Sequence, residues 1–191
     1  VMLGSPGVGK TSLVTRWVKD TFQESECPTV GAAYSQKVVS IDGEEHKIQI
    51  WDTSGEERYR SMAPIYCQGA SGALVLFDFT RKDTLDSVEQ WISCLEVSSQ
   101  IPIVLVGNKF DLYEEGNQNM VTLDMAIEKA DMLGLSFFST SASTGDGVND
   151  AFLFLTTNVV RRKKTQPVVD NCVNLNANAN DSDQGRSYCS C

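Results

Sequence analysis

The chain has 191 residues, which suits one globular domain with a tail and is too short for two domains of ordinary size. Hydrophobic residues make up 41% and charged residues 21%, and no apolar run approaches the roughly 20 residues of a membrane helix. The net charge of -9 argues against a general nucleic-acid binder, because that affinity depends on neutralising phosphates. We therefore expect no nucleic-acid partner.

Six cysteines are present, and Cys27, Cys67, Cys94 and Cys172 are scattered without the spacing of a disulfide framework. We expect these four to be reduced, cytosolic thiols. The first expected strand, 1–3, is only three residues long before a glycine-rich loop begins. We expect that residues are missing from the N-terminus.

Apolar runs bounded by turn residues alternate with segments of helical period, which predicts an α/β fold with a mostly parallel sheet and helices on both faces. Asp42 and Gly43 predict a two-residue hairpin turn, so one strand pair should be antiparallel. Apolar side chains at helical spacing predict sheet-covering helices over 85–95 and 148–159. The six expected strands are 1–3, 36–41, 47–51, 73–78, 103–107 and 135–139.

The segment 4–11 satisfies the pattern GxxxxGK(S/T) between an expected strand and an expected helix. In this pattern, backbone N–H groups and a helix N-terminus hold phosphates, the lysine reaches the outer phosphates and the hydroxyl binds Mg²⁺. The alternative is a chance glycine-rich turn, which each further motif makes less probable. We assign nucleotide binding here to Gly7, Val8, Gly9, Lys10, Thr11 and Ser12.

Asn108, Lys109 and Asp111 follow the fifth expected strand and match the pattern NKxD. The Asp111 carboxylate can accept hydrogen bonds from N1–H and the exocyclic amine of guanine, whereas adenine offers an acceptor at N1. This polarity favours GTP and GDP as ligands and argues against a P-loop kinase or ATPase.

The order of these motifs resembles that of small GTPases of the Ras superfamily, and of the Rab family among them. The segment 51–57 (WDTSGEE) resembles WDTAGQE of the second switch, and 28–31 (PTVG) resembles the first switch. The resemblance implies a P-loop NTPase small G domain over 1–164, with a six-stranded, mostly parallel sheet. Its cofactors would be GTP or GDP and Mg²⁺, and the implied metal ligands are Thr11, Thr29 and Asp52.

The resemblance also implies contacts with the base. Phe22 would lie against guanine, with an ordinary core position as the alternative. The backbone N–H groups of a TSAK-like stretch would meet guanine O6, although a serine stands where the lysine is usual; its residues here are Ser141, Ala142 and Ser143. Glu26 occupies a position where tyrosine is frequent, so the flap over the phosphates should be looser.

Two positions depart from the family at the expected catalytic centre. Glu56 replaces a glutamine and Pro6 replaces a small residue of the phosphate loop. A carboxylate can accept from the attacking water but cannot donate to the transition state, and about 5 Å from the γ-phosphate it would add repulsion of roughly 3 kcal/mol at an effective dielectric of about 20. We expect a GTPase with slow intrinsic hydrolysis, using Lys10, Gly55 and Glu56; the alternative is a hydrolysis-impaired, GTP-bound recruitment module.

Aromatic residues mark an expected partner surface. Trp51 falls on the polar side of its strand, and together with Tyr34 and Tyr66 it matches the triad that Rab proteins present to effectors. The alternative is three ordinary packed aromatics. The resemblance further implies an exchange factor, a GTPase-activating protein and the prenylation and GDI machinery as partners of a monomer. The switch sequences resemble early-endosomal Rabs, which implies vesicle and endosomal traffic on the cytoplasmic face of endomembranes, in exchange with the cytosol.

The segment 165–191 is poor in large apolar residues, which predicts a disordered tail. Its last residues, Cys189, Ser190 and Cys191, match the CxC ending of Rab proteins and imply two geranylgeranyl groups. Two lipid chains anchor a protein stably where a single chain does not. The basic run 161–164 suits either attraction to anionic lipid or a favourable contact with the helix dipole.

Overall fold

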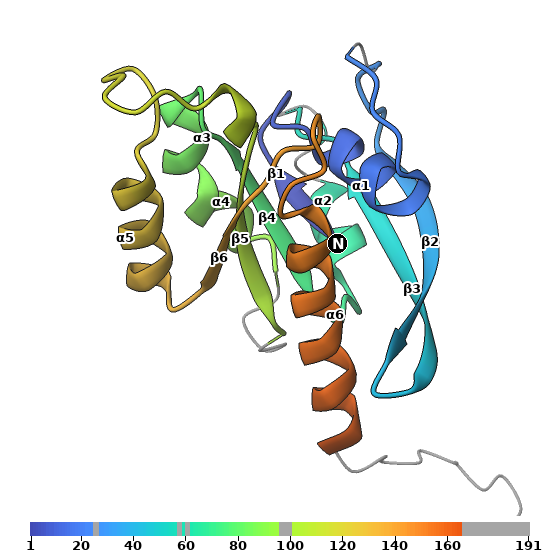
Figure 1. Cartoon of the computed structure of the whole chain (residues 1–191). Coiled ribbons are helices and arrows are strands. Elements are labelled where there is room, and N and C mark those ends of the chain that lie inside the picture. The colour runs from blue at the N-terminus through green and yellow to red at the C-terminus, as the bar shows by residue number, and fades with distance from the viewer. Residues whose placement is uncertain (25–26, 57–58, 60–61, 96–100, 166–191) are drawn as a thin grey trace, which may run out of the picture.

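A computed structural model describes residues 1–24, 27–56, 59, 62–95 and 101–165 (Figure 1). A six-stranded sheet forms the centre of this part, in the order β2-β3-β1-β4-β5-β6. β2 and β3 pair antiparallel, and all the other neighbours pair parallel. The strands are β1 Met2–Gly4, β2 Ala32–Ile41, β3 Glu44–Thr53, β4 Ala73–Asp78, β5 Ile103–Asn108 and β6 Ser136–Ser139. The predicted fold class is confirmed.

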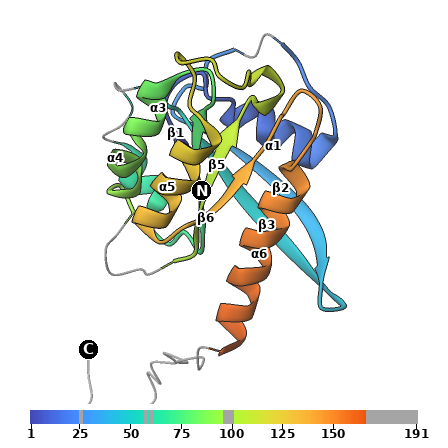
Figure 2. The ribbon, with the colours of Figure 1, turned by 60° about the vertical axis from the view of Figure 1, so that its left-hand side comes forward.

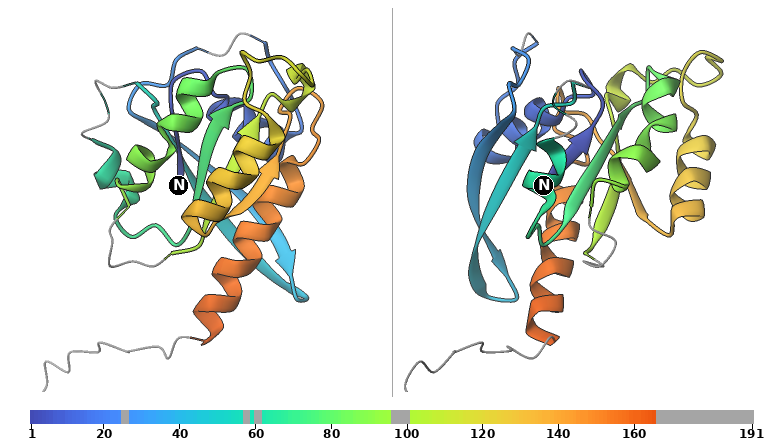
Figure 3. Two further views of the ribbon diagram at one scale, coloured as in Figure 1. Left: turned by 90° about the vertical axis from the view of Figure 1, so that its left-hand side faces the viewer. Right: turned by 180° about the vertical axis from the view of Figure 1, so that it is seen from behind.

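Helices cover both faces of the sheet. α1 and α6 pack on one face, while α3, α4 and α5 pack on the other, as the opposite views in Figures 1 and 3 show. The alternation of β4 divides the core accordingly: Leu74 and Leu76 belong to the first face, Val75 and Phe77 to the second. The helices are α1 Lys10–Lys19, α2 Ala63–Cys67, α3 Lys82–Asp86, α4 Val88–Ile92, α5 Leu123–Leu133 and α6 Val148–Thr165, and a 3-10 helix spans Phe110–Leu112.

The β2–β3 hairpin turns at the predicted dipeptide. Asp42 and Gly43 have φ values of 54° and 82°, the positive values that a two-residue turn of this kind requires. Both strands are longer than expected, because pairing runs from Ile41 opposite Glu44 to Ala32 opposite Thr53. The additional residues are mostly small or charged, so they carry no apolar signal, although their backbone groups pair equally well.

The apolar stripe expected over 85–95 is divided between two short helices, α3 and α4, and helical structure ends at Ile92. α3 ends and α4 begins at Ser87, whose hydroxyl donates to the Thr84 carbonyl at 2.9 Å. The Thr84 hydroxyl in turn donates to the Arg81 carbonyl at 2.6 Å. Side chains that bond to nearby backbone groups in this way compete with helix continuation, which explains the break.

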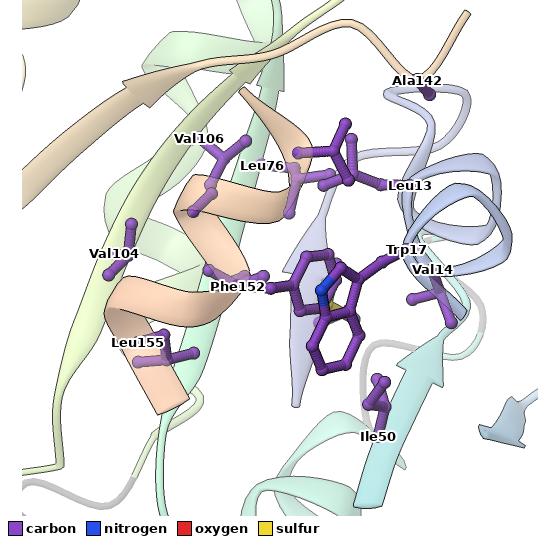
Figure 4. Close-up of a cluster of buried hydrophobic side chains, with 14 of the residues drawn as sticks. Leu13, Val14, Trp17, Ile50, Leu76, Val104, Val106, Ala142, Phe152 and Leu155 are labelled. Atoms are coloured by element: carbon purple, nitrogen blue, oxygen red, sulfur yellow. The ribbon is translucent and has the colours of Figure 1, made fainter. Parts of the chain in front are cut away.

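The face with α6 contains the tightest aromatic packing. Trp17 of α1 and Phe152 of α6 stack with ring centroids 4.2 Å apart and planes within 5° (Figure 4). This stack fixes α6 against the helix that follows the glycine-rich loop. Ile50 of β3 completes the same cluster, so the loop, the hairpin and α6 share one core.

The C-terminal end of α6 lies beside the hairpin turn, at the end of the molecule opposite the glycine-rich loop (Figures 1 and 2). Arg161 contacts Asp42 at 3.3 Å and Lys164 contacts Glu44 at 2.8 Å. These pairs lower the pKa of both carboxyls. Such exposed pairs contribute little stability. They show that two residues of the basic run 161–164 contact carboxylates of the hairpin, which neither the lipid interpretation nor the helix-dipole interpretation of this run included.

Three cysteines, Cys27, Cys67 and Cys94, are free thiols, as expected. Burial raises the pKa of the Cys67 thiol to about 11. None of the helices in the described part of the chain has both the length and the apolar character of a membrane span. Glu26, Cys172 and the terminal cysteines lie outside the described residues, as does most of the predicted tail.

Candidate nucleotide-binding site

A cavity of about 610 Å³ opens where β1, β3, β5 and β6 end. Open α/β sheets commonly bind ligands at this edge, because the loops that leave parallel strands meet there. Most of the residues predicted to bind the nucleotide or the metal ion or to act in hydrolysis line this cavity; the exceptions are Val8, Asp52 and Ser141. The predicted residues that line it are Gly7, Gly9, Lys10, Thr11, Ser12, Phe22, Thr29, Gly55, Glu56, Asn108, Lys109, Asp111, Ala142 and Ser143.

Lys10 lies inside the glycine-rich loop. Its Nζ donates to the carbonyls of Gly4 at 2.7 Å and Ser5 at 3.0 Å, and the residue is only 6% exposed. Burial lowers the pKa of Lys10 to about 8, although the Asp52 carboxylate opposes that shift. The loop thus wraps an ammonium group with its own carbonyls, while its N–H groups stay available for an anion.

Three oxygen-bearing side chains meet beside this lysine. The Thr11 hydroxyl donates to Asp52 Oδ2 at 2.7 Å and lies 3.0 Å from the Thr29 hydroxyl. Mg²⁺ prefers such oxygen ligands, so the set fits the implied metal. Among the described residues, no group of three or more His, Cys, Asp or Glu side chains could hold a metal ion instead.

Two glycines allow the loops to approach one another. A Cβ on Gly55 would lie 2.5 Å from Lys10 Nζ and 2.6 Å from the nitrogen of Pro6. A Cβ on Gly9 would lie 2.3 Å from Asn108 Nδ2. Each distance is below any normal contact, so both positions require glycine for steric reasons.

Asn108 joins two loops that are predicted to bind different parts of the ligand. Its Nδ2 donates to the Val8 carbonyl at 2.9 Å, and its Oδ1 accepts from Thr140 Oγ1 at 3.3 Å and Ala142 N at 3.2 Å. The residue is fully buried. The NKxD motif therefore begins with a side chain that holds the phosphate loop against the 140–142 loop.

Two backbone N–H groups of the 141–143 loop that were predicted to meet guanine donate to other groups of the protein instead. The Ser141 N–H donates to the Asp146 carbonyl at 3.0 Å, and the Ala142 N–H donates to Asn108. Arg16 of α1 binds the other side of the loop, donating to the carbonyls of Ala142 at 2.9 Å and Ser143 at 2.7 Å. Sequence reasoning missed Arg16, because no motif connects it with a loop so far along the chain.

The remaining residues that are predicted to surround the base also line the cavity. Asp111 is exposed there, and Lys109 has a left-handed backbone and pairs with the buried Asp78 at 2.6 Å. Asp78 ends β4 and belongs to none of the sequence motifs, so the sequence did not identify it as part of the site. Phe22 lines the cavity and also packs against the core, and its contact with guanine stays a prediction.

The two predicted switches meet through their backbones. Ser54 N–H donates to the Gly31 carbonyl at 2.7 Å, and the Ser54 hydroxyl accepts from Glu56 N–H at 3.3 Å. Thr29 and Glu56, from opposite switches, both line the cavity. Much of the segment after Glu56 lies outside the described residues.

The three predicted surface aromatics are adjacent. Ring centroids lie 5.4 Å apart for Tyr34 and Trp51 and 5.7 Å apart for Trp51 and Tyr66. Tyr34 is 47% and Trp51 41% exposed, so these two are not ordinary core residues. Their effector role stays a prediction.

A glycine-rich loop that leads from a strand into a helix, at this edge of a parallel sheet, defines a P-loop nucleotide-binding protein. The profile of the Ras family matches residues 1–161, and the chain belongs to that family. It is 37% identical over 164 residues to Ras-related protein Rab-4 of Dictyostelium discoideum, an alignment that covers 85% of this chain and 78% of the relative. The chain is a Rab-like small GTPase, as its motifs predicted.

The role of Asn108 can be tested by Asn108→Ala. We expect the free energy of unfolding to fall by about 2–4 kcal/mol, because buried partners lose their hydrogen bonds, and GDP affinity to fall at least about tenfold. Urea unfolding and GDP titration measure the two effects. Asn117→Ala, which removes exposed hydrogen bonds to Glu114 and Asn119, is the control and should change stability by less than about 0.5 kcal/mol. Equal effects of the two substitutions would contradict the role of Asn108.

Proposed function

We propose that this protein is a GTP-binding molecular switch that hydrolyses GTP slowly to GDP and recruits effectors in membrane traffic. The observation that carries the proposal is the single cavity lined by a phosphate loop, by Thr29 and Gly55 of two separate switches and by Asp111 of a guanine motif. Mg²⁺, when bound by Thr11, Thr29 and Asp52, would neutralise phosphate charge. Contacts from both switches to one phosphate group would order them together, which is how such switches signal.

Selectivity for guanine is proposed to rest on Asp111. The carboxylate lines the cavity, and it accepts hydrogen bonds without donating any, as N1–H and the exocyclic amine of guanine require. The buried Asn108 and the pair between Lys109 and Asp78 hold the backbone three and two residues before it.

We expect Asp111→Asn to weaken GTP binding and to favour xanthine nucleotides, because an amide can donate to the oxygen that replaces the exocyclic amine. Loss of the matched pair should lower GTP affinity by roughly 100-fold or more. Competition between GTP and XTP for a fluorescent nucleotide measures the selectivity. Asp131→Asn, an exposed carboxylate of α5, is the matched control; unchanged GTP affinity in Asp111→Asn would refute the guanine assignment.

Slow hydrolysis is proposed from two residues at the cavity. Glu56 lines it and can accept a hydrogen bond from an attacking water, but its carboxylate cannot donate to the transition state. Pro6 lines the same cavity and has no N–H to donate. Stabilisation by an arginine from an activating protein is worth about 10³ to 10⁵ in rate and depends on access to this place. Acceleration by such a partner should therefore suffer more than intrinsic hydrolysis does.

We expect Glu56→Gln to raise the intrinsic single-turnover rate of GTP hydrolysis. The gain should stay below about 100-fold, since the repulsion removed is at most roughly 3 kcal/mol and Mg²⁺ and Lys10 screen it. The measurement follows GTP hydrolysis by the native chain and by Glu56→Gln, each with and without an activating protein, and Glu128→Gln on α5 serves as the control. A rate in Glu56→Gln no higher than that of the native chain would contradict the inhibitory role of Glu56.

The same two residues support a second candidate, a hydrolysis-impaired module that recruits partners while it holds GTP. The nucleotide found in freshly purified protein separates the candidates: GDP favours the cycling switch and GTP favours the recruitment module. The native rate decides as well. No detectable hydrolysis over about a day, restored by Glu56→Gln, would favour the recruitment module.

The effector surface is proposed to centre on Tyr34, Trp51 and Tyr66. Val30 and Ile65, which are 75% and 65% exposed, extend the apolar character of the two switches. Aromatic residues are common anchors of interfaces, and both switches contribute to this one. An exchange factor, an activating protein and prenylation and GDI machinery are the further partners that membership of a Rab-like class suggests.

Membrane attachment is proposed to use geranylgeranyl groups on Cys189 and Cys191. α6 ends at Thr165, opposite the cavity, so a tail from that end would leave the switches accessible to partners (Figure 1). The resemblance of the switch sequences to early-endosomal Rabs supports an endosomal membrane, with exchange between membrane and cytosol.

We expect the double variant Cys189→Ser with Cys191→Ser to move from the membrane fraction to the cytosol, because two lipid chains are what anchors a soluble domain stably. Fractionation of cells that express the full chain measures this. Cys172→Ser, also in the tail, is the control and should stay with membranes. Membrane sedimentation of the double variant would show that something else anchors the protein.

A further inference from the structure

Arg81 contacts the phosphate loop from outside every nucleotide motif. It follows β4, and its Nη1 donates to the Pro6 carbonyl at 3.1 Å. The same atom is the nearest neighbour, at 3.7 Å, of a Cβ built on Gly7. The loop after β4 and the loop after β1 lie at the same end of the sheet (Figure 1). A guanidinium group therefore sits against the peptide that joins Pro6 to Gly7.

Asp83 fixes the orientation of this guanidinium. Arg81 Nε lies 3.4 Å from Asp83 Oδ1, and Nη2 lies 2.8 Å from Oδ2. A bidentate pair holds the planar group in one orientation, and here it directs the remaining nitrogen, Nη1, to Pro6. The Arg81 side chain is 41% and the Asp83 side chain 70% exposed, so the pair serves better to orient Arg81 than to stabilise the fold.

The direction of the Pro6 carbonyl determines the direction of an N–H. The described part of the chain has no cis peptide bond, so the carbonyl of Pro6 and the N–H of Gly7 lie in one plane and point in opposite directions. The carbonyl points to Arg81, and Gly7 lines the cavity. A carbonyl that accepts a charged hydrogen bond also polarises its amide, which makes the N–H a stronger donor. The N–H matters more here because Pro6 has none.

A second tether from the same segment supports this arrangement. Ser5, the residue before Pro6, has its hydroxyl 2.8 Å from that of Ser87 and 3.4 Å from Trp91 Nε1. The carbonyl of Ser5 accepts from Lys10. The segment 81–91 thus holds two consecutive residues of the phosphate loop, one by its side chain and one by its carbonyl.

We propose that Arg81, oriented by Asp83, is a positioning residue that keeps the Gly7 N–H directed at the nucleotide phosphates. This inference rests on the proposed function, because it requires a phosphate in the loop. Arg81 acts through the peptide of Pro6 and Gly7 and not by touching the phosphate. It should therefore affect how long a nucleotide stays bound, whatever the hydrolysis rate.

The test compares Arg81→Ala, Arg81→Lys and Asp83→Asn in the full chain with GDP and Mg²⁺. Two quantities are measured: the dissociation rate of a fluorescent GDP, and the ¹H chemical shift of the Gly7 amide. We expect Arg81→Ala to speed dissociation by about three- to tenfold and to move the Gly7 resonance upfield. Arg81→Lys keeps the charge and a donor but loses the bidentate pair with Asp83. Its dissociation rate and its Gly7 shift should therefore lie between those of Arg81→Ala and those of the native chain, as should those of Asp83→Asn.

Arg161→Ala is the matched control, because Arg161 is also an exposed arginine paired with an aspartate. It should change neither the dissociation rate nor the Gly7 resonance. A change in melting temperature alone, with both readouts as in the native chain, would overturn the inference and leave Arg81 a structural residue. A native chain that binds no GDP would instead refute the proposed function, so the two failures are distinguishable.

Discussion

The structure depends on how the phosphate loop is held from outside. A loop rich in glycine has few side chains with which to fix its own conformation, and its N–H groups must stay available for an anion. The conformation of the loop is therefore fixed by hydrogen bonds to its carbonyls and by close contacts with its backbone. Asn108 binds the Val8 carbonyl, Lys10 binds those of Gly4 and Ser5, and Gly55 packs directly against the loop. The cavity exists because these contacts come from different strand ends.

The same arrangement explains how a ligand at the cavity could influence a distant surface. Gly31 of the first switch accepts a hydrogen bond from Ser54, at the start of the second. β2 and β3 carry this junction along a continuous antiparallel ladder to Tyr34 and Trp51. A change in either switch thus acts on residues that are paired with each other, and the exposed aromatics lie on that pair of strands. The cavity and the exposed aromatics are thus connected by backbone hydrogen bonds and by the pairing of β2 with β3.

The charged side chains around the phosphate loop come from different segments of the chain. Lys10 is a buried cation inside the loop, whereas Glu56 brings a carboxylate to the cavity. Arg81 adds a cation on the outer side, at the Pro6 carbonyl. Because Pro6 removes one N–H from the loop, the orientation of the next peptide has greater weight than in a loop without proline. The charged side chains around the loop thus come from different segments of the chain, and one of them, Arg81, contacts this peptide.

The sequence alone determined the fold class, the approximate positions of the six strands, the helical segments over 85–95 and 148–159 and most of the residues that line the cavity. It could do so because the glycine-rich loop, the NKxD motif and the Asp-Gly turn each depend on local chemistry at fixed spacing. It did not reveal the break at Ser87, which arises where side-chain hydroxyls compete with the helix. Nor did it reveal Arg16 and Arg81, which reach the site from segments far away in the chain. Only the tertiary structure brings such residues to their partners. They contact the site through backbone carbonyls, and because every residue has a carbonyl, no sequence pattern indicates which one will be bound.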